Sequence, residues 1–461
     1  GGLSLEMLVC MFPVSVLGAI KEHEVTSLPG WTGPLPSKHY SGYLPVGKTS
    51  GSPGFIHYWL ILSERAPDTD PLVYWTNGGP GGSGINAGLL TEMGQLHLNE
   101  NSLSNASTAV PQLLYNKFNW ATVANTLYVS QPKGVGFSYC TGSKCVNTDL
   151  TAAQDAVDFF HAFFDGYSEF KARDFYLTAE SYGGIYIPTF MKLMDADGGF
   201  PNLKGAAIGD GCWGNEVGLC AFNSGKAQQI QMQTFFGHSM ISNQRFAALE
   251  KACAPWDDDD VKKPACRALL AAVNLDIGRF DVYNIYDTCA GDSSLDSSGT
   301  WARTHAEWNA ALAAPVVEIP NDPATPAIPQ LVYGAAATVE QSARPQSVVG
   351  AALNDYPCGG DRVTRQWLQS EGVAAALHVT ADKGGMRYEK GPMSFSGDLL
   401  PLYADLMKKV GPPSPPFPPL PLPLHRPTST LIPAAPASHV IICPRICAAQ
   451  KDARPLSDPS L

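Results

Sequence analysis

The stretch Ala179-Glu180-Ser181-Tyr182-Gly183 decides the fold of this 461-residue chain. Residues 174–178 before it are largely aromatic and apolar, which is typical of a buried central strand. Residues 183–188 after it lead into a periodic segment that is typical of a helix. Small residues two positions before and after Ser181 allow a sharp turn that lifts its Oγ off the sheet edge. The stretch therefore predicts a serine nucleophile on a strand-to-helix turn, and an ordinary loop serine is the alternative.

A glycine-rich segment, residues 77–84, follows an apolar strand predicted at residues 71–75. Glycine leaves backbone N–H groups bare and close to a bound group, which suits an oxyanion or a carboxylate. A flexible surface loop is the alternative. The segment precedes Ser181 by about a hundred residues, which is the chain order of oxyanion loop and nucleophile in the α/β-hydrolase fold. The two motifs together predict an α/β fold of that type.

Further motifs lie at residues 27–31, 37–44, 75–81, 134–139 and 179–188, with weaker matches at 205–211, 283–287 and 373–379. In this order they resemble the serine carboxypeptidase family, and the resemblance extends from about residue 24 to about residue 408. It implies an α/β-hydrolase fold, in which helices flank a central, mostly parallel sheet and a cap region is inserted. It also implies a peptidase that acts on peptide or protein C-termini without a cofactor.

The resemblance implies catalytic roles around the serine. Ser181 is expected to form the acyl-enzyme. The backbone N–H groups of Tyr182 and Gly79 are expected to form the oxyanion hole that stabilises the tetrahedral intermediate.

The resemblance also implies a site for the free C-terminal carboxylate of the substrate. Asn77 and Glu180 are expected to hold this carboxylate, and Glu92 is expected to be a second glutamate that faces Glu180. Two carboxyl groups held close together share a proton, so one of them can donate a hydrogen bond to the substrate. This arrangement favours activity under acidic conditions. The alternatives are a turn residue at Asn77 and a solvated helix residue at Glu92.

The acid and the base of a Ser–His–Asp mechanism are not found in the sequence. The family carries them in a Ser-Gly-Asp-x-Asp and a Gly-His-x-Val-Pro segment, and neither segment is present. Asp398 precedes a predicted helix at residues 399–406 and is expected to be its N-cap. His238 and His378 match structural positions of the family, and His425 and His439 lie after residue 410, outside a Gly-His setting, so none of the four is assigned as the base. The catalytic Asp and His are therefore unknown, and their absence would lower the rate by several orders of magnitude.

The composition of the chain changes abruptly at residue 410. Residues 411–427 cannot form a buried strand, because their many prolines lack the N–H that a ladder requires. We therefore expect the C-terminal strands of the sheet to be missing and residues 410–461 to be extended or disordered. A mistranslated continuation, such as a retained intron, is the preferred explanation, and a truncated non-catalytic product is the alternative.

The sequence predicts five consecutive regions. They are a signal-peptide-like segment (1–20), a first part of the core (21–213), a cap-like insertion (214–342), a second part of the core (343–409) and the proline-rich tail (410–461). Strands are predicted at residues 46–63, 71–75, 126–130 and 203–208, a helix at 151–164, and a mostly helical segment at 348–409. The apolar residues 5–20 are too short to span a bilayer and lack a basic start, so a buried strand is the alternative.

The composition fits a secreted α/β protein with a large core. Charged residues make up 16% of the chain and the formal net charge is −11, so no basic face would neutralise nucleic-acid phosphates. The acidic residues 257–260 are expected to form a solvated loop, with a calcium site as the alternative. We expect no bound metal and no stable membrane span, and a homodimer is left open.

Eleven cysteines indicate an oxidising compartment. Short separations suggest two local disulfides, Cys140–Cys145 and Cys212–Cys220, while the remaining cysteines of the insertion, Cys253, Cys266 and Cys289, compete for partners. A zinc site is the alternative, but the chain lacks a Cys-x2-Cys pair. In the family a cysteine commonly stands at the position of Gly82 and pairs with one near Cys358, so Cys358 lacks its usual partner.

A single glycosylation sequon begins at Asn105. Together with the cysteines, it favours the secretory pathway, with the vacuole or lysosome or the extracellular space as the destination. The sequence thus predicts a serine carboxypeptidase. An acyltransferase of the same family, which would use the same serine, and a non-catalytic binding or protective relative, which would explain the missing base, are the alternatives.

Overall fold

A computed structural model describes residues 20–103, 110–142, 145–214, 218–221, 224–277, 360–379, 398–409 and 440–442. Several sequence predictions lie outside these ranges. They are the signal-like segment up to residue 19, the sequon at Asn105, Cys289, Cys358, His425, His439 and residues 278–342 of the cap-like insertion.

The described residues form a nine-stranded sheet in the order β1-β2-β3-β7-β4-β9-β10-β11, with β8 paired to β3. Strands β1, β2, β3 and β7 are antiparallel to one another, whereas β7, β4, β9, β10 and β11 form a parallel run. The strands of this sheet are β1 (Glu24–Val25), β2 (His39–Val46), β3 (Gly54–Ile61), β4 (Leu72–Thr76), β7 (Asn125–Ser130), β8 (Tyr139–Cys140), β9 (Phe175–Glu180), β10 (Leu203–Gly209) and β11 (Val440–Ile442). A separate two-stranded antiparallel sheet pairs β5 (Leu96–His97) with β6 (Leu114–Tyr115). This mixed sheet, parallel at its centre, confirms the predicted fold class.

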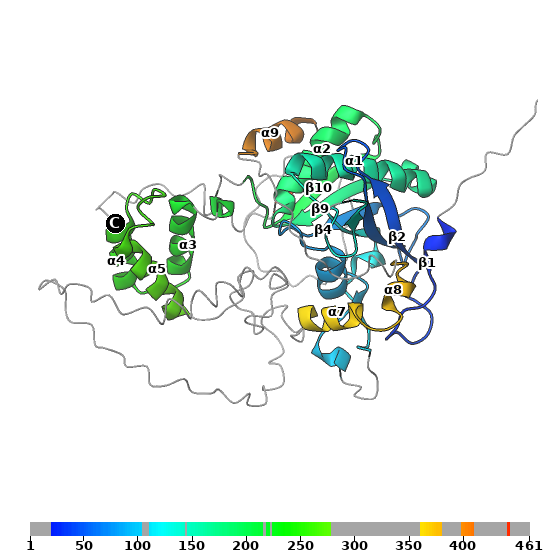
Figure 1. The fold of residues 1–461 in the computed structure, drawn as a ribbon, viewed down its shortest axis with the longest axis horizontal. Helices are drawn as coiled ribbons and strands as arrows, with labels where there is room; N and C mark the ends of the chain where they lie inside the picture. The colour runs from blue at the N-terminus through cyan, green and yellow to red at the C-terminus, as the bar shows by residue number, and fades with distance from the viewer. Residues whose placement is uncertain are drawn as a thin grey trace, which may run out of the picture.

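Helices cover both faces of the sheet (Figure 1). Tyr58 and Leu60 of β3 pack in one core with α1 and α2, whereas Trp59 packs in a second core with α7 and α8, because successive strand residues point to opposite faces. The helices are α1 (Asp149–Gly166), α2 (Gly183–Asp197), α3 (Gly225–Gly237), α4 (Asn243–Cys253), α5 (Pro264–Ile277), α7 (Gly360–Leu368), α8 (Val373–Ala376) and α9 (Leu400–Lys409). Shorter helical segments are η1 (Lys21–His23), η2 (Ile85–Glu92), η3 (Glu100–Leu103), η4 (Trp120–Thr122), η5 (Ser168–Ala172) and η6 (Gly218–Cys220).

Helix α1 confirms the helix predicted at residues 151–164 and is longer at both ends. The Thr148 side chain accepts a hydrogen bond from the N–H of Thr151, whose own side chain accepts one from the N–H of Thr148. This capping box satisfies two N–H groups at the start of the helix. Phe160 and Phe163 are fully buried against the sheet and hold the apolar face of the helix there.

The strands predicted at residues 126–130 and 203–208 are confirmed as β7 and β10. The single strand predicted at residues 46–63 is not formed, because a turn at residues 47–53 separates β2 from β3. Gly47 in this turn has a φ of +98°, and a Cβ there would lie 2.1 Å from the carbonyl oxygen of Ser52. The turn therefore requires glycine at this position and ends β2 at Val46.

The C-terminal tail differs from the prediction in one respect. Residues 440–442 form β11, which pairs in parallel with β10 and extends the sheet beyond it. The expectation that the C-terminal strands are missing is therefore wrong at this position. The physical reason is local composition: Val440-Ile441-Ile442 is β-branched and contains no proline, so its N–H groups can join the ladder.

Helices α3, α4 and α5 pack around an apolar cluster of their own, which includes Met232, Leu249 and Trp256. They lie to one side of the sheet (Figure 1). The disulfide Cys253–Cys266 joins the end of α4 to the start of α5, and the two predicted disulfides, Cys140–Cys145 and Cys212–Cys220, are both formed. The cap-like insertion at residues 214–342, with its position over the site, stays a prediction.

None of the helices in the described ranges is long and apolar enough to cross a membrane. In the same ranges, no group of three or more His, Cys, Asp or Glu side chains is arranged to hold a metal ion. In the acidic run at residues 257–260, the Asp258 carboxylate accepts a hydrogen bond from the N–H of Gly225 at 2.9 Å. This contact ties the run to the start of α3.

Candidate active site

Ser181 lies between β9 and α2 and has a φ of +56°, which is unusual for a residue with a side chain. Its N–H donates to the Gly209 carbonyl at 2.9 Å, and its own carbonyl accepts from the N–H groups of Gly184 and Cys212. A Cβ at Gly183 would lie 2.3 Å from the Cβ of Ala179. The turn is therefore possible only with a small residue before the serine and a glycine after it, which is the pattern that the sequence shows.

The glycine-rich loop packs directly against this turn. A Cβ at Gly78 would lie 2.3 Å from the backbone nitrogen of Tyr182, so the two backbones touch. Gly79 has a φ of +111°, a conformation that glycine adopts without strain. The loop is held in place by Gln131, whose side chain donates to Thr76 Oγ1 at 3.0 Å. The structure thus places the glycine-rich loop against the backbone of Tyr182, and the oxyanion hole formed by Gly79 and Tyr182 stays a prediction.

Asn77, Glu92 and Glu180 meet beside the serine. The Asn77 Nδ2 group donates to Glu180 Oε1 at 3.1 Å and to the Glu92 carboxylate at 3.3 Å and 3.4 Å. Glu180 Oε1 also accepts from the N–H of Gly78 at 3.2 Å. Residues that are 15 and 103 positions apart from Asn77 in the sequence therefore form one cluster.

Two groups that the sequence analysis did not identify fix the orientation of the Asn77 amide. Its Oδ1 accepts from Trp75 Nε1 at 2.8 Å and from the N–H of Gly88 at 3.1 Å. With the oxygen occupied, the amide nitrogen must face the two glutamates. Trp75 and Asn77 are two residues apart along an extended segment, so their side chains lie on the same face. This spacing in the sequence could have predicted the hydrogen bond between Trp75 and Asn77.

The pKa values of both carboxyl groups are raised. The Glu92 side chain as a whole is exposed to solvent. Desolvation of its carboxylate by the surrounding protein, with the charge of Glu180 as the second cause, raises the pKa of Glu92 to about 8. Burial also raises the pKa of Glu180, which the hydrogen bonds from Gly78 and Asn77 partly offset. Below the apparent pKa, the pair holds a proton and can donate a hydrogen bond to an anionic ligand.

No histidine in the described ranges is hydrogen bonded to Ser181. Six of these histidines have side-chain contacts elsewhere: His23 with Tyr58, His39 with Gln95, His57 with Ser41 and the Leu377 carbonyl, His97 with the Glu92 carbonyl, His161 with Asp197, and His378 with the Ser41 carbonyl. The seventh, His238, directly follows α3, where its backbone N–H donates to the Thr234 carbonyl at 3.0 Å. His378 thus has the structural role expected of it. Asp398 accepts a hydrogen bond from the N–H of Leu400 at 2.8 Å, at the start of α9, which agrees with its predicted capping role.

The sequence of the chain matches the Serine carboxypeptidase family over residues 29–410. It is 30% identical over 397 residues to serine carboxypeptidase-like 20 of Arabidopsis thaliana, which covers 83% of this chain and 75% of that protein. It is 33% identical over 275 residues to the lysosomal protective protein of Mus musculus, which covers 59% of this chain and 53% of that protein.

Among solved structures, a prohormone-processing carboxypeptidase from Saccharomyces cerevisiae superposes with a TM-score of 0.54 at 18% identity, over 85% of this chain and 77% of that one. At this identity the superposition supports the fold alone. The family match spans more than half of the sequence and contains the elbow, the glycine-rich loop and the Asn77–Glu92–Glu180 cluster. The chain therefore belongs to the serine carboxypeptidase family.

Proposed function

We propose that this chain is a serine-type carboxypeptidase that releases C-terminal residues from peptides or proteins through an acyl-enzyme on Ser181. The observation that carries the proposal is the cluster of Asn77, Glu92 and Glu180 next to the serine elbow. An amide N–H and a protonated carboxyl pair suit a free carboxylate, which only the last residue of a peptide carries at the scissile bond.

The chemical steps follow from this placement. Ser181 Oγ forms a bond to the carbonyl carbon, the C–N bond then breaks, and the C-terminal amino acid leaves with a proton. The N–H groups of Gly79 and Tyr182 stabilise the oxyanion that forms between these two events. Water hydrolyses the acyl-enzyme and restores the serine. The proton of Oγ requires a base, and we assign this role to none of the described residues.

A matched pair of substrates tests the carboxylate site. The unmodified protein should hydrolyse an N-blocked dipeptide with a free C-terminus and should hydrolyse its C-terminal amide far more slowly. Asn77→Leu keeps the size of the side chain but removes the amide donor, so kcat/KM for the free acid should fall by about 10- to 100-fold. The amide substrate serves as the internal control. Equal hydrolysis of both substrates by the unmodified protein would contradict the proposal.

The pKa of Glu92 predicts how substrate binding depends on pH. As the pH rises through about 8, the pair loses its shared proton and two carboxylates then face the carboxylate of the substrate. KM should therefore rise by about tenfold for each pH unit above the pKa, with kcat less affected. Glu92→Gln keeps a hydrogen-bond donor but does not titrate, so its KM should change much less between pH 6 and 9.

Steady-state kinetics across this range measure the effect. Glu100→Gln, which changes an exposed glutamate of η3, is the control and should follow the unmodified protein. If Glu92→Gln shows the same rise in KM as the unmodified protein, another group controls the pH dependence.

The second candidate is a relative that binds peptide C-termini without turnover. It is favoured by the lack, among the described residues, of a histidine hydrogen bonded to Ser181. Calorimetry and product analysis on the same peptides separate the two candidates: binding without release of the last residue supports this one. An acyltransferase would instead transfer the acyl group to an added alcohol, and mass spectrometry would detect the ester.

The three disulfides of the structure support a location in the secretory pathway, in a vacuole or lysosome or outside the cell. Asn105 is then the proposed glycosylation site. Treatment with an N-glycosidase should lower the mass of the unmodified protein and should leave the mass of Asn105→Gln unchanged. This result would support both the secretory location and the glycosylation of Asn105.

A further inference from the structure

The side chain of Tyr182 connects the serine elbow to helix α1. Its hydroxyl donates to Asp149 Oδ1 at 3.0 Å. Both residues are almost completely buried, with exposed fractions of 1% for Tyr182 and 5% for Asp149. Asp149 is the first residue of α1, and Tyr182 is the N-cap of α2. A hydrogen bond to a carboxylate is stronger than one between neutral groups, so this contact ties the starts of the two helices together.

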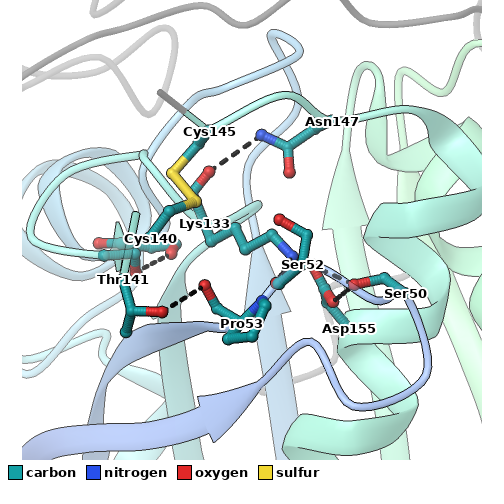
Figure 2. The surroundings of a disulfide bond; sticks show 11 residues. Ser50, Ser52, Pro53, Lys133, Cys140, Thr141, Cys145, Asn147 and Asp155 are labelled. Carbon is teal, nitrogen blue, oxygen red and sulfur yellow. Dashed lines mark hydrogen bonds and ion pairs between the residues drawn. A yellow bond between two sulfur atoms is a disulfide. The ribbon is translucent and has the colours of Figure 1, made fainter. Parts of the chain in front are cut away.

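The start of α1 is held in place by the segment before it. The disulfide Cys140–Cys145 closes a loop in this segment, and Asn147 Nδ2 donates to the Lys133 carbonyl at 2.9 Å (Figure 2). The capping box described above then fixes the first turn of the helix. A carboxylate in this turn is favoured by the helix dipole. Asp149 therefore presents an acceptor in a defined position to the elbow.

Tyr182 is also held at its ring and at its backbone. The ring packs edge-on against the ring of Tyr186 at a centroid distance of 5.1 Å. The Tyr182 carbonyl accepts from the N–H groups of Ile185 and Tyr186 in the first turn of α2. On the other side of the residue, the backbone nitrogen lies against Gly78 of the glycine-rich loop. Because the N–H and the side chain leave from adjacent atoms, fixing the far end of the side chain restricts how the N–H can turn.

We propose that Asp149 is a positioning residue for the oxyanion hole. By accepting from the Tyr182 hydroxyl, it keeps the N–H of Tyr182 directed at the oxyanion that forms on the substrate. The inference rests on the proposed function and goes beyond it by assigning a role to a residue that does not touch the substrate. Stabilisation of an oxyanion depends on donors that are oriented before the reaction, and a displacement of about 1 Å lowers the rate by about 100-fold.

Steady-state kinetics on an N-blocked dipeptide with a free C-terminus give the first measurement. Asp149→Leu keeps the approximate size of the side chain and removes the acceptor, so kcat should fall by about 10- to 100-fold with KM nearly unchanged. Asp149→Asn keeps an oxygen that accepts from the hydroxyl and should recover most of this loss. Tyr182→Phe removes the donor and should resemble Asp149→Leu. The double variant should lose no more than either single variant, because both changes break the same contact.

Binding of an N-blocked phenylalaninal gives a second measurement that reports on the oxyanion hole itself. Ser181 Oγ bonds to the aldehyde carbon and its proton passes to the aldehyde oxygen, which then lies where the oxyanion forms. Asp149→Leu should weaken the binding of this aldehyde by about 10- to 100-fold. The binding of the corresponding alcohol, N-blocked phenylalaninol, which forms no adduct, should be unchanged. A loss of structure around the elbow would instead weaken the binding of both compounds.

Tyr115→Phe is the matched control, because it also removes a tyrosine hydroxyl that donates to a carboxylate, Glu64 Oε2, at 2.8 Å, but on an exposed residue of β6. Its kcat and its affinity for the aldehyde should equal those of the unmodified protein. Thermal unfolding shows which variants are folded, and if Asp149→Leu is not, Tyr182→Phe carries the same comparison. The proposal is overturned if kcat and aldehyde affinity are unchanged, or if aldehyde and alcohol binding weaken equally.

A failure of the proposed function gives a different result. If the unmodified protein hydrolyses no peptide but binds the aldehyde more tightly than the alcohol, loss of that preference in Asp149→Leu supports the role of Asp149, and its persistence overturns it. If the unmodified protein shows no preference for the aldehyde, the oxyanion hole does not function and the role of Asp149 is overturned. Hydrolysis by the unmodified protein that Asp149→Leu does not slow overturns the role of Asp149 alone.

Discussion

Replacing Ser181 with alanine is expected to lower kcat for peptide hydrolysis by about 10³- to 10⁶-fold and to leave the affinity for the peptide nearly unchanged. The wide range reflects how far the oxyanion hole can act without a nucleophile. The Asn77–Glu92–Glu180 cluster is separate from the Oγ atom, so binding of the free carboxylate should persist. Single-turnover hydrolysis and calorimetric binding of the same peptide measure the two quantities.

Ser239→Ala is a suitable control for this variant. Ser239 is exposed and has a φ of +60°, close to the +56° of Ser181, so the same substitution is made on a similar backbone. Its hydrolysis rate and thermal stability should match those of the unmodified protein. If Ser181→Ala hydrolyses the peptide as fast as the unmodified protein, Ser181 is not the nucleophile.

The turn at the serine and the glycine-rich loop could be predicted because their backbone geometry depends on neighbouring residues. The turn at Ser181 needs a small residue at Ala179 and a glycine at Gly183, and those residues stand within one short stretch. The same is true of the turn glycines near Gly78. Local constraints of this kind remain visible in a single sequence.

The other parts of the site and of the sheet depend on residues that are distant in the sequence. The proximity of Asn77 to Glu92 was inferred from a family resemblance, and nothing in its spacing distinguishes Glu92 from a solvated glutamate. Strand β11 was not predicted, because a three-residue apolar run after a proline-rich segment has no periodicity to identify it.

The buried ion pair between Lys133 and Asp155 is the clearest case of a feature that the sequence conceals. Both side chains are fully buried, and Lys133 Nζ lies 2.7 Å from Asp155 Oδ2. The Lys133 ammonium also donates to Ser50 Oγ at 3.2 Å and to the carbonyl of Ser52, and Ser50 Oγ donates to Asp155 Oδ1 at 2.6 Å (Figure 2). In a single sequence, an aspartate on a helix and a lysine after a proline are typical of exposed positions.

This pair joins three parts of the chain. Lys133 follows β7, Asp155 lies on α1, and the two serines belong to the turn between β2 and β3 (Figure 2). Burial raises the pKa of Asp155, while the Lys133 charge and the Ser50 hydrogen bond act in the opposite direction. Removing the lysine alone would therefore leave a buried carboxylate without its cation.

Lys133→Met is expected to lower the free energy of unfolding by about 3–5 kcal/mol at pH 7, because the Asp155 charge would remain buried without its partner. The double variant Lys133→Met with Asp155→Leu removes both charges and should recover most of this loss. The matched control is the exposed ion pair between Lys171 and Asp165, which also involves α1. Lys171→Met should lower the free energy of unfolding by about 0–1 kcal/mol. Urea unfolding of the four proteins measures these differences.

The pH dependence of the Lys133→Met variant distinguishes an uncompensated charge from a simple loss of packing. Without the lysine, the pKa of Asp155 in the folded state should lie further above its value in the unfolded chain. A carboxyl group with a raised folded-state pKa destabilises the fold as the pH rises through that pKa, and the cost disappears once the group is protonated. The difference between Lys133→Met and the unmodified protein should therefore shrink from pH 7 to pH 4. A difference that stays constant over this range would mean that lost packing around the lysine chain, and not the charge of Asp155, causes the destabilisation.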